Sequence, residues 1–263
     1  MTFDALLLLT AGFFGGALNA IAGGGSFFTF PALLAVGVPP IAANATNTFA
    51  ACAGYLSGAY ALRRELAGHR SRLPGLILIS LLGGLLGAGL LLQAGEVLFR
   101  QSIPWLLLLA TSLFAFGGPL NARLRRRCRH QPRRSTPDRG PLHWLLPVLL
   151  LGVCVYGGFF NAGLGIIALS YLILAGETDI HVMNGLKLLI STLVSVAALI
   201  LFGLHGAIAW GEGGLVLIGT LAGGYVAAHL SRQIPQGWVK GFVIVVGAGI
   251  TAYFFAETYW IAE

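Results

Sequence analysis

The sequence predicts an all-α polytopic membrane protein built from two homologous repeats. Of its 263 residues, 57% are hydrophobic and only 10% are charged, whereas a soluble domain is about 45–50% apolar and about 25% charged. Apolar stretches of about 20 residues, the length that crosses a bilayer as a helix, recur along the whole chain. These observations exclude a soluble globular fold and leave no room for a sizeable soluble domain.

The elements follow from the hydrophobic blocks, taken in chain order. The blocks run over residues 5–22, 26–38, 42–62, 73–93, 103–120, 144–162, 164–175, 182–204, 213–230 and 238–256. The second and seventh are shorter than the about 17–25 residues that a span needs. Both are therefore expected to be broken or re-entrant segments, near residues 23–38 and 163–175. The backbone groups freed by such breaks must face protein or a water-lined cavity, so the breaks point to a binding site.

The two halves share a pattern that predicts an internal duplication. Phe14–Ala20 matches Tyr156–Ala162, and Asn44–Asn47 matches Asn184–Lys187. Chance similarity between glycine-rich apolar sequences is the alternative, but the order and spacing of the matches favour duplication. Each half also has a helix with spaced glycines, assigned to close packing: Gly83, Gly84 and Gly87, and Gly219, Gly223 and Gly224. The predicted division is a first repeat, an Arg-rich cytoplasmic linker and a second repeat, each repeat with about four long helices: residues 1–120, 121–143 and 144–263.

The basic residues favour opposite orientations of the two repeats. Loop 63–72 and the linker 121–143 are rich in arginine, as cytoplasmic loops are. The counterpart of loop 63–72 in the second half, 205–212, has no Lys or Arg, whereas loop 231–240 has more basic residues than its counterpart 94–102. This exchange favours inverted repeats with both termini outside. A parallel arrangement, with four spans in each half and both termini inside, stays an alternative.

Lys187 is the strongest candidate for a functional residue because it is a lone cation within an apolar helix. Such a cation costs about 2.5–3.5 kcal/mol on insertion scales unless it faces a cavity, a partner or a ligand. Asn184, Ser191 and Ser195 share its helix face by their spacing. The pattern indicates an anion-binding face. The alternative is a structural lysine that pairs with a carboxylate or reaches the membrane interface.

Amide and hydroxyl groups near the predicted helix starts and breaks complete the candidate site. Helix N-termini present unpaired N–H groups and a partial positive charge, which favour an anion, and glycines let backbone N–H groups approach it. The alternative is that these residues cap helices or join them. The candidate binding residues are Asn19, Gly23, Gly24, Gly25, Ser26, Thr46, Asn47, Asn161, Asn184 and Lys187.

The sequence lacks the motifs of common enzymes, nucleotide-binding proteins and metal-binding proteins. The sequence has no Walker A pattern, no H-E-x-x-H and no G-x-S-x-G, so neither an enzyme nor a cofactor is expected. The cysteines show no C-x-x-C pairing, so we expect neither a metal nor a disulfide. The net charge of +7 does not indicate nucleic acid, because eight of the sixteen basic residues lie between Arg123 and Arg139. The composition favours moving a solute over transforming one.

A set of motifs in residues 12–65 resembles a known family. Its members are Gly15-Gly16, Gly23-Gly24-Gly25, Pro31, Gly37-Val38-Pro39 and Ala43–Asn47. They resemble the TauE/SafE sulfite exporter family, also described as the 4-toluene sulfonate uptake permease family. The segment Gly157–Phe202 is similar to the family's second repeat, with Lys187 where the family often has a lysine. Two features depart from that pattern: Leu186 replaces a small hydroxylated residue, and the second glycine cluster is reduced to Gly163 and Gly165.

The resemblance implies a secondary transporter in the bacterial inner membrane. It would move a small inorganic or organic anion, a sulfur-containing oxyanion or an organosulfonate, by alternating access. The implied partners are that anion, protons or another coupling ion, and membrane lipid; a homo-oligomer is left open. His181 and Glu177, beside the second break, are the candidates for carrying protons. A passive small-anion channel and a membrane enzyme or assembly factor without transport stay as alternatives.

Overall fold

The computed structural model describes residues 2–21, 24–66, 68, 72–129, 142–230 and 236–260. Within these ranges the chain is almost wholly helical and has no strand. The helices are α1 (Thr2–Ile21), α2 (Ser26–Ala35), α3 (Pro40–Ala61), α4 (Arg63–Leu66), α5 (Leu73–Arg129), α6 (Leu142–Phe159), α7 (Leu164–Leu174), α8 (Ile180–Leu204), α9 (Trp210–Leu230) and α10 (Gln236–Tyr259). The predicted all-α class is confirmed.

Four helical stretches in the described part of the chain are long and apolar enough to cross a bilayer. They are Thr2–Ala20, Leu73–Gly118, Ile180–Leu204 and Gly241–Tyr259. Large apolar side chains on these stretches are exposed, such as Leu78 at 59% and Val245 at 72%. An exposed apolar surface of this kind suits contact with lipid tails rather than water.

Two helices meet within residues 94–102, as expected, but the connection is shorter than the expected loop, because α5 leaves helical geometry there only at Gly95. Its two arms, residues 73–94 and 96–129, meet at Gly95, whose φ of +73° and ψ of 163° lie where only glycine is comfortable. The polar residues that suggested a loop are on a helix instead, and Arg100 forms an ion pair of 3.0 Å with Glu257 of α10. Because α5 runs on to Arg129, the predicted linker begins as helix; residues 130–141 lie outside the described residues.

The two short helices follow interruptions of the chain. α2 has ten residues and includes Pro31, and α7 has eleven residues. Gly163, with φ +82°, provides the left-handed turn into α7. Neither helix is long enough to span a bilayer, as the breaks in the sequence predicted. The first residues of both helices line the same cavity.

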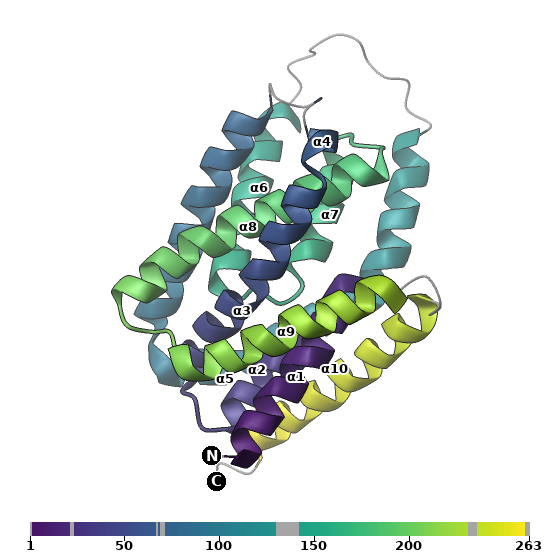
Figure 1. The fold of residues 1–263 in the computed structure, drawn as a ribbon. Coiled ribbons are helices and arrows are strands. Elements are labelled where there is room, and N and C mark those ends of the chain that lie inside the picture. Colours follow the sequence, from purple (N-terminus) through teal and green to yellow (C-terminus); the bar gives the residue numbers. More distant parts are fainter. Residues whose placement is uncertain are drawn as a thin grey trace.

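The first helix of each half packs against the Gly-spaced helix of the other half (Figure 1). The Gly-spaced helix α9 packs along α1, and the first arm of α5 packs along α6. Both contacts are backbone-close: a Cβ added at Gly223 would overlap the backbone oxygen of Phe13, and one at Gly87 would overlap that of Val155. The start of α1 and the end of α10 lie together, and α4 lies at the opposite end. These features support the duplication and its inversion, which stay predictions.

We expect Gly223→Ala to destabilise the protein, because the methyl group would force α9 away from α1. Overpacking of this kind costs about 1–3 kcal/mol. Gly214→Ala is the matched control, since no atom outside the helix lies within 4 Å of that Cβ position in α9. The measurement is the thermal transition of the purified protein, followed by size-exclusion chromatography. Equal transition temperatures for the two variants would contradict the close packing.

Candidate functional site

A cavity of about 720 Å³ lies between helices of both halves. Its wall is formed by the C-terminal part of α1, the start of α2, helices α3, α8 and α9, and the chain at residues 161–165. Of the predicted binding residues, the lining includes Asn19, Ser26, Asn161, Asn184 and Lys187. The structure thus brings together side chains that lie far apart in the sequence.

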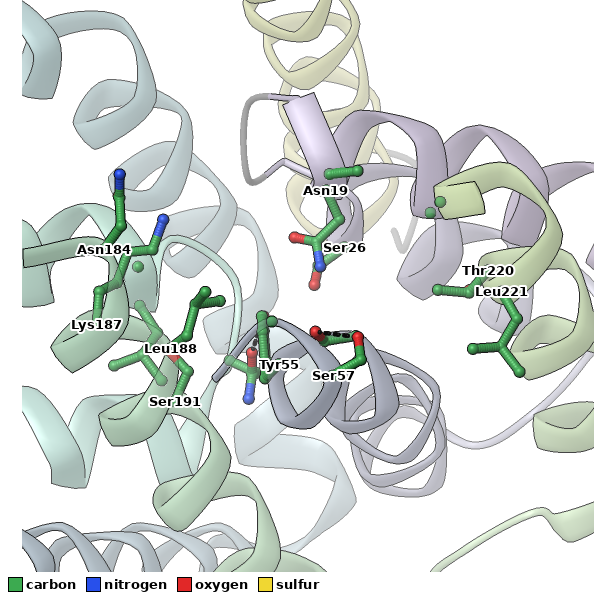
Figure 2. A pocket seen from close by; sticks show the side chains of 18 of the residues that line it. Asn19, Ser26, Tyr55, Ser57, Asn184, Lys187, Leu188, Ser191, Thr220 and Leu221 are labelled. Carbon is green, nitrogen blue, oxygen red and sulfur yellow. Dashed lines mark hydrogen bonds between the residues drawn. The ribbon is translucent and has the colours of Figure 1, made fainter. Parts of the chain in front are cut away.

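Lys187 is a half-buried cation on the α8 side of this cavity (Figure 2). Its stem lies against the first turn of α7, where a Cβ added at Gly165 would be 3.4 Å from the lysine Cδ. Among the residues that the structure describes, Lys187 has neither an ion pair nor a hydrogen bond. A cation at membrane depth without a protein partner needs water or an anion beside it.

The acidic residues nearest to Lys187 in the sequence are engaged elsewhere. Glu177 forms an ion pair of 2.9 Å with Arg72. Asp179 caps α8, where its carboxylate accepts hydrogen bonds from the backbone N–H groups of His181 at 2.8 Å and Val182 at 3.4 Å. Neither acid lines the cavity. The carboxylate pairing considered for a structural lysine is therefore not formed with these two residues.

Asn184 and Ser191 continue the polar face of α8. Both line the cavity with Lys187, one turn before it and one turn after it. In the described part of the chain, the Asn184 amide has no hydrogen-bond partner, so it is free to bind a ligand. Figure 2 shows these residues on one side of the pocket, with Tyr55 in the middle and Thr220 on the far side.

Asn161 joins the two halves at the wall of the site. It is 1% exposed, and its Oδ1 accepts a hydrogen bond of 2.8 Å from the Tyr55 hydroxyl of α3. Its Nδ2 donates to the Ser195 hydroxyl of α8 at 3.0 Å. Because both ends of the amide are used, Asn161 holds the second break against α3 and α8.

At the first break, between α1 and α2, polar side chains also line the cavity, and a buried asparagine lies behind them. Asn19, at the end of α1, and Ser26, the first residue of α2, line the cavity. Asn47 lies behind them and is 2% exposed; its amide donates to the Ser26 hydroxyl at 3.2 Å and its carbonyl accepts from the Thr29 hydroxyl. Asn47 therefore positions the start of α2 from outside the cavity.

Thr46 has a structural position instead of a place in the cavity wall. Its side chain is fully buried, and its hydroxyl accepts a hydrogen bond of 3.0 Å from the Ala209 backbone N–H just before α9. This contact satisfies a donor at a helix start, as a cap does. A capping role therefore fits the surroundings of Thr46 better than direct contact with a ligand does.

The glycines of the first break serve close packing where they are described. A Cβ at Gly25 would overlap the backbone oxygen of Gly15, and one at Gly24 would lie 2.7 Å from Val243. Neither glycine lines the large cavity. Gly23 lies outside the described residues. The backbone cradle predicted at this run therefore stays a prediction.

Tyr55 and Thr220 are among the lining residues that reasoning from the sequence missed. Tyr55 lies eight residues after Asn47 on α3, so helical spacing put it on a face that already carried an amide. Thr220 lies next to Gly219 among the packing glycines of α9, so the sequence pattern indicated helix packing there and not a binding residue. Its hydroxyl is buried and has no hydrogen-bond partner among the described residues.

The described residues of the lining offer no set of ligands for a metal. Among the described residues, no group of three or more His, Cys, Asp or Glu side chains could hold a metal ion. The polar side chains among its described lining residues carry amides, hydroxyls and one ammonium, which donate hydrogen bonds to oxygen atoms. This donor set can hold an anionic oxygen group, with Lys187 supplying the opposite charge.

Residues 8–254 match the sulfite exporter TauE/SafE family. The chain belongs to this family. A probable membrane transporter protein of Escherichia coli K12, YfcA, is 30% identical over 95% of this chain and 93% of its own length. A probable membrane transporter protein of Haemophilus influenzae is 28% identical over 97% of this chain and 95% of its own length. No solved structure shows a significant match.

The family and these relatives establish the function class and the location. The chain is a membrane transporter and not an enzyme, and it is a multi-pass protein of the inner membrane. The motifs in residues 12–65 therefore identified the family correctly. The match over residues 8–254 includes all the described residues that line the cavity.

Proposed function

We propose that this protein is a secondary transporter that moves a sulfur-containing oxyanion or an organosulfonate across the membrane by alternating access. One observation carries the proposal: the unpaired, half-buried ammonium of Lys187 on the wall of a cavity whose other described lining groups are uncharged. The family description as sulfite exporters supports this chemical class of anion.

The anion would bind next to Lys187, with amides that line the cavity as further donors. Asn184 lies one helical turn from Lys187, and Asn19 and Ser26 line the cavity from the other half. Hydrogen bonds between charged and polar partners are stronger than those between neutral ones. Donors from α8 and from the α1–α2 break line the same cavity, so binding would depend on how the two halves are placed.

The position of the cavity suggests which side is open. Its lining extends to Leu62, next to the last residue of α3, and to Tyr225 in the last turns of α9. The segments that follow these two helices in the sequence, 63–72 and 231–240, carry basic residues, so we place them in the cytoplasm. This state would therefore face inward. Rocking of one repeat against the other would expose the anion on the opposite side.

Proton coupling is part of the proposal, and the geometry changes its candidate carrier. Neither His181 nor Glu177 lines the cavity, and Glu177 is paired with Arg72. Lys187 lines it, and an amine is a group that can release and rebind a proton, so we assign the exchange of a proton to Lys187. Deprotonation after release would allow an empty site to return without carrying a charge across the membrane.

The test is transport by the purified protein in lipid vesicles. We expect saturable uptake of radiolabelled sulfite or methanesulfonate that responds to an imposed pH gradient. Uptake that does not saturate, together with ohmic current in a planar bilayer, would indicate a channel instead. Absence of uptake for a broad panel of anions, with protein shown to be inserted, would contradict transport of anions.

A further inference from the structure

The cavity contains one charged side chain among its described lining residues. That residue is Lys187; the other polar groups of this described lining are amides and hydroxyls of Asn, Ser, Thr and Tyr, with no carboxylate, guanidinium or imidazole. Arg63, which follows the lining residue Leu62, is exposed and lies over the ring of Tyr60 at 4.1 Å from its centroid. The described wall thus offers one positive charge to a ligand.

A single buried cation sets a charge limit on what can bind. A ligand with one negative charge forms a pair with Lys187 that has no net charge. A ligand with two negative charges leaves one of them without a counterion in a poorly polarisable environment, which is costly. Neutral donors such as Asn184 and Asn19 stabilise oxygen atoms, but they do not cancel a net charge.

The volume of the cavity does not limit the ligand as its charge does. A volume of about 720 Å³ exceeds what a bare oxyanion fills and is in the range of pockets for drug-sized ligands, about 300–1,000 Å³. Leu164, Leu188 and Leu221 line the wall beside the polar groups. An organic tail therefore has space and apolar contacts, so charge rather than bulk decides the selection.

We infer that the transporter selects singly charged anions, organosulfonates and singly protonated oxyanions among them, and rejects dianions such as sulfate. The inference rests on the proposed function and goes beyond it by fixing the charge of the cargo. The loaded site is then neutral, which is the state that crosses the membrane region at the lowest electrostatic cost.

The test uses two competitors that share a carbon skeleton and differ in charge. Uptake of radiolabelled methanesulfonate into vesicles is measured with unlabelled ethanesulfonate or ethane-1,2-disulfonate, at constant ionic strength. We expect the disulfonate and sulfate to compete at least about tenfold more weakly than ethanesulfonate. Equal competition by the disulfonate would overturn charge selection while leaving anion transport intact. Absence of any methanesulfonate uptake would overturn both.

A charge-adding variant makes the test independent of the shape of the competitors. Asn184→Lys places a second ammonium one helical turn from Lys187, on the same cavity wall. In this variant we expect ethane-1,2-disulfonate to compete at nearly the same concentration as ethanesulfonate, whereas Asn184→Gln keeps the preference for the single charge. An Asn184→Lys protein that transports methanesulfonate and still rejects the disulfonate would contradict the role of the charge balance.

Discussion

Replacing Lys187 with alanine is expected to abolish anion uptake while leaving the fold intact. Losing one member of a buried charged pair costs about 2–5 kcal/mol, which lowers uptake at low substrate concentration by at least about 30-fold. Lys187→Arg keeps the positive charge and should retain part of the activity. The measurement is initial uptake of labelled methanesulfonate into vesicles, normalised to the amount of inserted protein.

Thermal stability separates this role from a structural one. Lys187 has no ion pair or hydrogen bond within the described ranges, so alanine removes no protein contact of that kind. The transition temperature of Lys187→Ala should therefore equal or exceed that of the wild type, because a desolvated charge is removed. A variant that unfolds at lower temperature, or that transports at the wild-type rate, would show that the lysine has another purpose.

Asn161→Ala is expected to reduce both stability and uptake. The substitution leaves the hydroxyls of Tyr55 and Ser195 without their partner at the junction of the halves. A buried polar group without a partner costs about 1–3 kcal/mol. Because the same residue lines the cavity and holds the second break, we expect uptake to fall at least about tenfold. The transition temperature and the initial rate are measured on the same preparation.

Two tyrosines of α3 supply a matched pair for this prediction. Tyr55→Phe removes one of the two hydrogen bonds of Asn161 and should have a smaller effect than Asn161→Ala, in the same direction. Tyr60→Phe is the control, because Tyr60 lies on the same helix, is 67% exposed and does not line the cavity. We expect the control to keep the wild-type transition temperature and uptake rate. Equal behaviour of the two Phe variants would argue against the bridge between the halves.

The sequence predicted the parts of the site whose physics is local. A lone cation in an apolar run carries its cost wherever the helix packs, so Lys187 was identified without knowledge of its neighbours. Asn184 and Ser191 followed from helical spacing, and both line the cavity with it. The interruptions before α2 and α7 were predicted from glycines and from block lengths too short to span a bilayer.

Residues whose role depends on a distant partner were harder to predict. Thr46 was expected to bind the ligand, but its hydroxyl meets a backbone N–H that comes from the turn before α9. Gly25 was expected to approach an anion, but α1 occupies the space beside it. Thr220 was missed because its neighbours are packing glycines. For Thr46 the deciding contact joins α3 to the turn before α9, which no local pattern encodes; for Gly25 it comes from the end of α1 on the other side of the break.

The most direct test of the central claim is an experimental structure with an organosulfonate bound. We predict density for the sulfonate group beside the Lys187 ammonium, within the cavity formed by α1, α3, α8 and α9. Density for the anion at another place, or a Lys187 side chain paired with a carboxylate in an otherwise closed wall, would contradict it.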